Sequence, residues 1–156
     1  MNIAKNPKVS VIIPVLNMAN TIEQCLKSIF NQTYEPFEVI VVDGHSTDGT
    51  VDIAKTYPVR ILYNDRVWPG AGRQYGVENS EGDYVAFTDA DCILPNTWIE
   101  TLLSEFTDDV AGVGGGAINV GEGLWIQSIN SVLSTFLGGG NSAQNRPLTK
   151  KREEKE

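Results

Sequence analysis

Short β-branched runs alternate with helical patterns between residues 9 and 106, and this alternation limits the possible folds more than any other feature. The first two runs, at 9–15 and 37–42, are nearly continuous in Val, Ile and other apolar residues, which is typical of strands buried on both faces of a sheet. We expect strands at 9–15, 37–42, 59–63 and 84–88. Helices are expected at 22–30, through 51–54 after a cap within 46–48, at 70–79 and at 98–106. The order predicts an α/β fold with a Rossmann-like, doubly wound, mainly parallel sheet flanked by helices.

The length and charge of the chain limit its partners. Its 156 residues suit one domain of ordinary size, and an apolar fraction of 41% is enough for a core. The net charge of −8 disfavours a general nucleic-acid binder. An acidic protein that binds a nucleoside diphosphate needs a cation or a few well-placed basic groups.

The cysteines and the apolar segments indicate the compartment. Cys25 and Cys92 make no disulfide framework, and Met1–Pro7 has no signal-peptide pattern, so we expect a cytoplasmic protein. The longest apolar stretch, Leu124–Leu137, is too short and too polar to span a bilayer. Peripheral association with the inner face of the membrane stays open, although that stretch lacks a basic face.

Polar residues follow three of the predicted strands. Asn17, Asp43 and Asp89 each stand where such a strand ends. In doubly wound sheets, ligands bind beyond the carboxyl ends of the strands. The three positions therefore predict a binding site at one edge of the sheet.

Asp89-Ala90-Asp91 is the candidate metal site. Two carboxylates at i and i+2 point to one side if the strand geometry persists. Mg²⁺ and Mn²⁺ prefer such oxygen ligands, and a bound ion would neutralise the charge on a diphosphate leaving group. The alternative is an exposed acidic turn that caps the next helix, but the position after a buried strand favours a metal site.

Asp43 opens a turn with several polar residues. Its carboxylate could accept hydrogen bonds from a base or a ribose. Ser46, Thr47 and Asp48 are more simply explained as caps of the following helix. His45 is the only histidine, and we interpret it as a surface turn residue.

Arg73 and Arg66 are the candidate cations for phosphate. Arg73 lies near the start of a glycine-rich predicted helix, where backbone N–H groups and a guanidinium can bind an anion. The alternative is an ordinary surface ion pair. The stretch 112–117 matches a G-x-G-x-x-A pattern only weakly, and turn glycines explain it better.

Taken together, these motifs resemble the family 2 glycosyltransferases, which have the GT-A fold. The matching segments are Val9–Asn17, Val39–Thr50, Gly70–Asn79, Gly82–Asp91 and Gly138–Arg146. The resemblance implies a GT-A nucleotide-sugar-binding domain over residues 1–146, followed by a charged tail at 147–156.

The resemblance also implies roles for individual residues. Pro14 and Asn17 would line the nucleotide pocket, and Asp43 would bond the base, commonly uracil. Arg73 would help to hold the nucleotide, while Asp89 would contact the ribose and the metal region. Asp91 would be the direct ligand of Mg²⁺ or Mn²⁺. The implied donor is a nucleotide-diphosphate sugar, with a UDP-sugar favoured, and the implied acceptor is a saccharide or a polyprenyl phosphate.

The chain departs from the family pattern at two places. Many members have a Tyr that can stack on the base where this chain has Leu16, so any stacking must come from elsewhere. Inverting members also carry a catalytic carboxylate, often in a Glu-Asp pair, after a segment like 138–146, and no matching pair follows here. We therefore assign no catalytic residue, and we expect a truncated chain that lacks the base and part of the acceptor region.

Two other functions stay open on the sequence alone. Thr88–Ile93 faintly resembles the signature of haloacid-dehalogenase-type phosphohydrolases, although that signature normally opens its domain. A non-catalytic nucleotide-sugar-binding fragment would use the same pocket without transfer.

Overall fold

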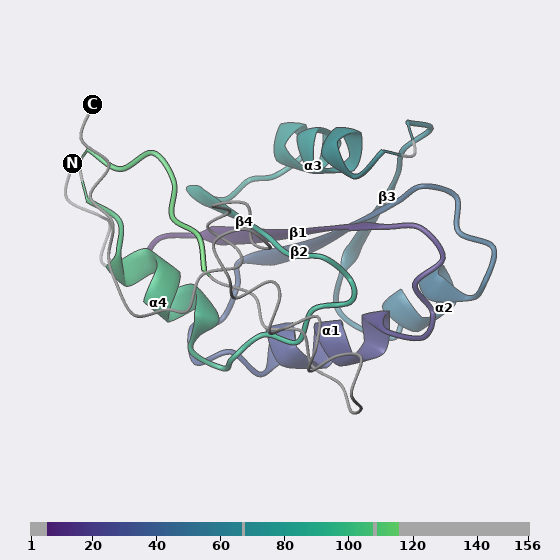
Figure 1. The fold of residues 1–156 in the computed structure, drawn as a ribbon, viewed down its shortest axis with the longest axis horizontal. Helices are drawn as coiled ribbons and strands as arrows, with labels where there is room; N and C mark the ends of the chain where they lie inside the picture. The colour runs from purple at the N-terminus through teal and green to yellow at the C-terminus, as the bar shows by residue number, and fades with distance from the viewer. Residues whose placement is uncertain (1–5, 67, 108, 116–156) are drawn as a thin grey trace, which may run out of the picture. The chain divides into compact units, whose positions relative to one another are not determined.

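The computed structural model describes residues 6–66, 68–107 and 109–115. Eight helices and strands are defined in this part of the chain, all within a compact unit formed by residues 1–104. In chain order they are β1 (Val9–Val15), α1 (Ile22–Phe30), β2 (Glu38–Asp43), α2 (Thr50–Ala54), β3 (Arg60–Tyr63), α3 (Pro69–Glu78), β4 (Tyr84–Phe87) and α4 (Trp98–Ser104). Figure 1 shows their arrangement.

The described strands form one parallel sheet with the order β3-β2-β1-β4. In the register, Val15 of β1 pairs with Asp43 of β2, and Asp43 in turn pairs with Tyr63 of β3. On the other side, β1 pairs with β4 from Val9 opposite Tyr84 onward. The predicted parallel α/β architecture is confirmed, and the carboxyl ends of the strands lie along one edge.

Helices cover both faces of this sheet, with α3 on one side and α1 and α2 on the other (Figure 1). Val39 and Val41 belong to the larger apolar cluster, together with residues of α1. Ile12, Ile40 and Val42 form a second cluster. Because successive side chains of a strand alternate between faces, both faces of β1 and β2 are buried, which explains their nearly continuous apolar sequence.

The boundaries differ from the predicted ones by one or two residues. The second strand begins at Glu38 instead of Phe37 and includes Asp43, because the Asp43 carbonyl accepts the Asn64 N–H at 2.9 Å. The last helix ends at Ser104, two residues early. Thr21 is the N-cap of α1, but its side chain makes no capping hydrogen bond.

Several predictions concern segments that the structure does not describe or describes only in part. Of the stretch 112–117, residues 112–115 are described and form neither helix nor strand. The stretches 124–137, 138–146 and 147–156 lie outside the described residues. Within the described part, no helix is long and apolar enough to cross a membrane.

Two glycines bring α3 close to the sheet. A Cβ on Gly76 would lie 2.5 Å from Cγ2 of Ile12, which is fully buried. A Cβ on Gly72 would lie 3.1 Å from the Cβ of Pro14, near the carboxyl end of β1. The absence of side chains at these positions allows the α3 backbone to approach the sheet, and it places Arg73 above the edge where the site is predicted.

Gly76→Ala should therefore destabilise the protein. Overpacking against the β-branched side chain of Ile12 is expected to lower the free energy of unfolding by about 1–3 kcal/mol. Gly70→Ala is the matched control, because a Cβ at Gly70 meets nothing within 4 Å. In that open position the better helix propensity of Ala should raise stability by up to about 1 kcal/mol. Urea unfolding measures the free energy of unfolding of both variants. An equal change in this free energy for the two variants would contradict a close approach at Gly76.

Candidate functional site

Hydrogen bonds join the β1–α1 loop to the β2–α2 loop at the carboxyl edge. We call residues 17–19 and 46–50 the loop clasp. The Asn17 N–H donates to Ser46 Oγ at 2.9 Å, and the Thr47 N–H donates to Asn17 Oδ1 at 2.8 Å. The Met18 N–H donates to Thr50 Oγ1 at 2.7 Å. These bonds hold the two loops together on either side of the predicted site.

The capping prediction for residues 46–48 is wrong for two of the three residues. Gly49, with φ +92°, is the N-cap of α2. Of the three expected caps, Asp48 bonds to the start of the helix, because its Oδ1 accepts the Thr50 N–H at 3.1 Å. Ser46 and Thr47 bond to Asn17 instead. The Asn17 side chain, which was expected to line a nucleotide pocket, is therefore engaged in holding the loops.

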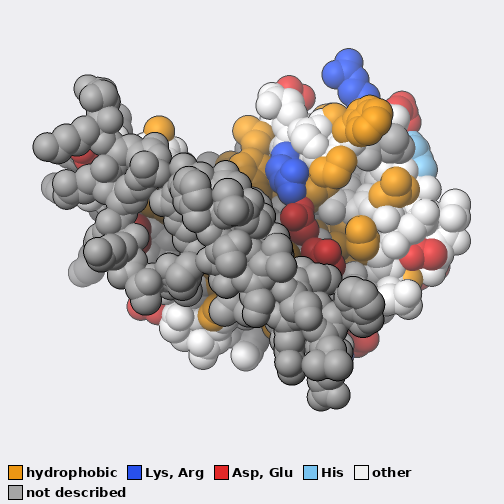
Figure 2. Space-filling model, viewed as in Figure 1, with side chains coloured by type: hydrophobic (Ala, Val, Ile, Leu, Met, Phe, Trp, Pro, Cys, Tyr) orange, Lys and Arg blue, Asp and Glu red, His pale blue; other side chains and the backbone are white. Residues whose placement is uncertain are grey.

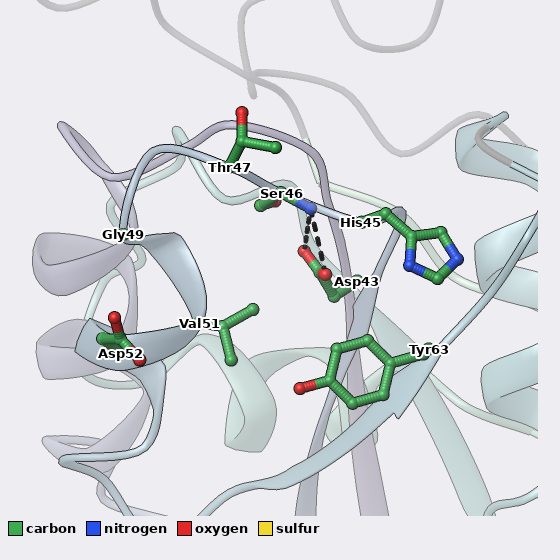
Figure 3. Close-up of a pocket in the computed structure, with 8 residues that line it drawn as sticks. All are labelled: Asp43, His45, Ser46, Thr47, Gly49, Val51, Asp52 and Tyr63. Carbon is green, nitrogen blue, oxygen red and sulfur yellow. Dashed lines mark hydrogen bonds between the residues drawn. The ribbon is translucent and has the colours of Figure 1, made fainter.

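Asp43 is a buried carboxylate beside a pocket. The residue is 1% exposed, and its two carboxylate oxygens lie 3.2 and 3.1 Å from the Ser46 N–H that donates to them. The pocket has a volume of about 450 Å³ and is lined by Asp43, His45, Ser46, Thr47, Gly49, Val51, Asp52 and Tyr63 (Figure 3). A carboxylate has about four acceptor sites, so Asp43 keeps capacity to accept a hydrogen bond from a ligand.

Two aromatic rings form one wall of this pocket. His45 is exposed, as expected of a turn residue, and its Nε2 lies 2.7 Å from Asp65 Oδ1. Its ring stacks on Tyr63, with 6.2 Å between the centroids and 18° between the planes. Tyr63 was not among the predicted site residues. The available signal was its place at the end of the third strand, beside the end of the second.

Arg73 and Asp89 form an ion pair between α3 and the segment after β4, in which an Arg73 guanidinium N–H donates to Asp89 Oδ1. The side chains are 34% and 56% exposed, so both remain accessible to a ligand. On the face drawn in Figure 2, acidic side chains lie directly beside a basic one. The structure thus brings together two predicted site residues. Arg66 lies in the β3–α3 loop, where its N–H donates to Asn64 Oδ1 at 3.1 Å.

Asp89 and Asp91 are both exposed and flank Ala90, which is 2% exposed. Ala90 and Asp91 lie in a turn in which the Cys92 N–H donates to the Asp89 carbonyl at 3.1 Å, so the expected strand geometry does not persist past β4, and β4 itself is only partly buried. Among the described residues, no group of three or more His, Cys, Asp or Glu side chains is placed to hold a metal ion. Two carboxylates still suit Mg²⁺ or Mn²⁺ when phosphate oxygens of a ligand complete the coordination. The donor set therefore fits a cation that arrives with a diphosphate.

Cys25 supports the backbone of this acidic segment from α1. Its Sγ donates to the Asp89 carbonyl at 3.4 Å, and the same carbonyl accepts the Cys92 N–H at 3.1 Å. Burial, together with the smaller effects of the nearby Cys92, Asp91 and Asp89 groups, raises the pKa of the Cys25 thiol to about 12. The thiol therefore stays protonated and available as a donor at neutral pH.

Asp48→Asn should lower the thermal midpoint of unfolding at pH 7. Hydrogen bonds from the Thr50 hydroxyl and from the Ala19 N–H lower the pKa of Asp48 in the folded protein. The stabilisation is therefore present above the unfolded pKa of about 3.9 and is lost as the pH falls through the folded pKa. The difference between parent and variant should shrink below about pH 4.

Asp52→Asn is the control for this experiment, because its side chain is 87% exposed and lies 4.0 Å from Lys55. It should change the midpoint little at any pH. If Asp48→Asn gave the same loss at pH 3 and at pH 7, the ionised carboxylate would not be what stabilises the clasp.

Comparison with known sequences identifies relatives over most of the chain. Residues 10–153 match the family described as Glycosyl transferase family 2. Glycosyltransferase GlyA of Streptococcus pneumoniae serotype 4 is 36% identical over 126 residues, which cover 76% of this chain and 18% of GlyA. Glycosyltransferase AglE of Haloferax volcanii is 38% identical over 120 residues, which cover 72% of this chain and 40% of AglE. The chain thus spans less than half the length of these relatives.

Solved structures share the same fold. S. aureus TarS 1–349 in complex with UDP superimposes with a TM-score of 0.58 and 30% identity over 62% of this chain and 31% of that one. The mannosyltransferase PcManGT from Pyrobaculum calidifontis, in complex with GDP-Man and Mn²⁺, gives a TM-score of 0.53 and 33% identity over 59% of this chain and 30% of that one. The strand order, the helices on both faces and the family match lead to one conclusion: this chain belongs to glycosyltransferase family 2 and has the GT-A fold.

Proposed function

We propose that this chain binds a nucleotide-diphosphate sugar across the carboxyl edge of its sheet and serves a metal-assisted glycosyl transfer. The observation that carries the proposal is the pair of exposed carboxylates, Asp89 and Asp91, beside Arg73. This charged group lies at the end of β4, and the Asp43 pocket lies at the end of β2, with β1 between them. Two strand spacings are roughly 10 Å, a distance that a nucleoside diphosphate can span.

Each side chain has a distinct task in this proposal. The Asp43 carboxylate accepts a hydrogen bond from an N–H of the base. Arg73 neutralises phosphate charge and also fixes the orientation of the Asp89 carboxylate through their ion pair. Pro14 forms the floor beneath the first turns of α3, where Gly72 approaches it.

Asp91, with Asp89, would hold the divalent cation. A bound Mg²⁺ or Mn²⁺ would stabilise the negative charge that develops on the departing diphosphate. Two structural relatives support this assignment, since PcManGT was solved with GDP-Man and Mn²⁺, and the M. tuberculosis glucosyl-3-phosphoglycerate synthase with UDP and Mn²⁺.

A UDP-sugar is the favoured donor, and TarS was solved with UDP and with UDP-GlcNAc. The acceptor, a saccharide or a polyprenyl phosphate, stays a prediction from the family resemblance, as do the cytoplasmic location and the peripheral membrane contact. The family match leaves the haloacid-dehalogenase interpretation without support. In addition, Asp89 follows β4, the last described strand, whereas that signature normally opens its domain.

Donor binding should depend on a divalent ion that Asp91 holds. Calorimetry of the parent with a UDP-sugar in Mn²⁺ and in chelator should show at least about a tenfold difference in affinity, roughly 1.4 kcal/mol. Asp91→Asn should abolish most of this difference, because it removes the charge of the ligand. Asp43→Asn should weaken binding under both conditions, because it alters contact with the nucleoside.

Glu23→Gln is the matched control, because it also removes one carboxylate charge, as Asp91→Asn and Asp43→Asn do. Glu23 is exposed on α1, where it pairs with Lys27 at 2.6 Å, so the variant should bind like the parent. Equal affinity of the parent in Mn²⁺ and in chelator would rule out a metal-bridged donor.

Transfer by a polypeptide of these 156 residues should be slow even when the donor is bound. General base catalysis contributes about 10²–10⁴-fold, and no acidic pair in the family context follows residues 138–146. The measurement is the release of nucleoside diphosphate from the bound donor against a panel of saccharide and polyprenyl-phosphate acceptors. Robust acceptor-dependent release would show that these residues do contain a base.

A further inference from the structure

The pocket beside Asp43 combines a buried acceptor with an exposed aromatic ring. Asp43 and Tyr63 are register partners on β2 and β3, so their side chains leave the same face of the sheet, one strand spacing of about 4.8 Å apart. Asp43 is 1% exposed, whereas Tyr63 is 53% exposed although its ring lines the pocket. In Figure 3 the Tyr63 ring lies beside the Asp43 carboxylate. A large aromatic ring is thus left open to a ligand next to a hydrogen-bond acceptor.

His45 holds this ring in place from the β2–α2 turn. Its φ of +66° is a conformation that residues with a side chain adopt rarely and that persists only where neighbouring contacts determine it. Two contacts do so here, the stacking on Tyr63 and the hydrogen bond to Asp65. Tyr63 is therefore backed by a second ring of fixed orientation, which reduces the side-chain entropy lost when a ligand binds.

A ligand that uses both features needs a flat π-face and an N–H on its edge. A nucleobase such as uracil has both, whereas ribose, diphosphate and a saccharide have no such face. The pocket also offers the base stacking that Leu16, at the position where many family members have Tyr, cannot supply.

We propose that Tyr63 is the platform on which the base of the donor nucleotide stacks, and that His45 is the positioning residue that holds the platform. This inference rests on the proposed function and adds the residues that recognise the base. Stacking on Tyr63 and the hydrogen bond to Asp43 act on the same base, so the base lies in the pocket between β2, β3 and α2.

The test measures the contribution of the base to binding separately from that of the ribose and the diphosphate. Affinity is measured by calorimetry in Mn²⁺ for UDP and for ribose 5-diphosphate, which lacks the base. Tyr63→Ala should weaken UDP binding by about tenfold or more, as expected for one lost base–aromatic stack, and should leave the affinity for ribose 5-diphosphate unchanged. Tyr63→Phe should bind both compounds like the parent. Tyr63→Leu keeps much of the side-chain volume but has no π-face, so it should bind both compounds as Tyr63→Ala does. It replaces Tyr63→Ala in the test if that variant does not fold.

His45→Asn tests the positioning role, because Asn tolerates a positive φ but has no ring. It should weaken UDP binding less than Tyr63→Ala does and leave ribose 5-diphosphate binding intact. In proton NMR of bound UDP, the ring current of Tyr63 should shift the uracil H5 and H6 signals upfield in the parent. His45→Asn should reduce this shift and Tyr63→Ala should remove it. Tyr75→Ala, at an exposed aromatic residue on α3, is the control and should change neither affinity nor shift.

The outcomes distinguish this inference from the function on which it rests. If the parent binds UDP but Tyr63→Ala and Tyr63→Leu bind it equally well, or lose UDP and ribose 5-diphosphate to the same extent, Tyr63 is not the base platform. If the parent binds neither compound in Mn²⁺, the proposed function itself is wrong and this inference falls with it.

Discussion

The parallel pairing of β1 with β2 is the interaction on which the rest of the described structure depends. Both strands are buried on both faces, so their backbone groups must be satisfied within the sheet, and their side chains must be covered by helices on each side. Parallel strands bring their carboxyl ends to one edge. The loops after β1, β2 and β4 therefore meet there, although Asn17 and Asp89 are 72 positions apart in the sequence.

This edge is held by polar groups that satisfy one another before any ligand arrives. The loop clasp joins two loops through Asn17, Ser46, Thr47, Asp48 and Thr50. The Ser46 N–H also binds the Asp43 carboxylate, so the turn after β2 is fixed from both sides. Asn17, which the family resemblance assigned to the nucleotide pocket, thus holds the frame of the proposed site, and a site that is already organised loses less entropy on binding.

The second determinant is the spacing between α3 and the sheet. Gly76 and Gly72 allow the helix backbone to pack directly against Ile12 and Pro14. This packing places Arg73 within reach of Asp89, on a different element. Cys25 holds the backbone carbonyl of Asp89 from α1, on the other face of the sheet. The accessible carboxylate of Asp89 is therefore placed by contacts from both layers of helices.

The sequence alone determined the order of the elements, the parallel α/β architecture and the polar ends of the strands, because each of these depends on local periodicity and on chain connectivity. It also indicated Arg73, Asp89 and Asp91 as members of a site. It could not show that Arg73 pairs with Asp89, because that contact depends on how closely a glycine-bearing helix packs on the sheet.

Only the tertiary structure decided which of these residues contact one another. Ser46 and Thr47 were expected to cap α2, but they bond to Asn17 of the neighbouring loop instead. Tyr63 carried no local signal beyond its place at a strand end, and its position beside Asp43 follows from the register of β2 and β3. Register and loop contacts join residues that are distant in the chain, and no local pattern of residues specifies them.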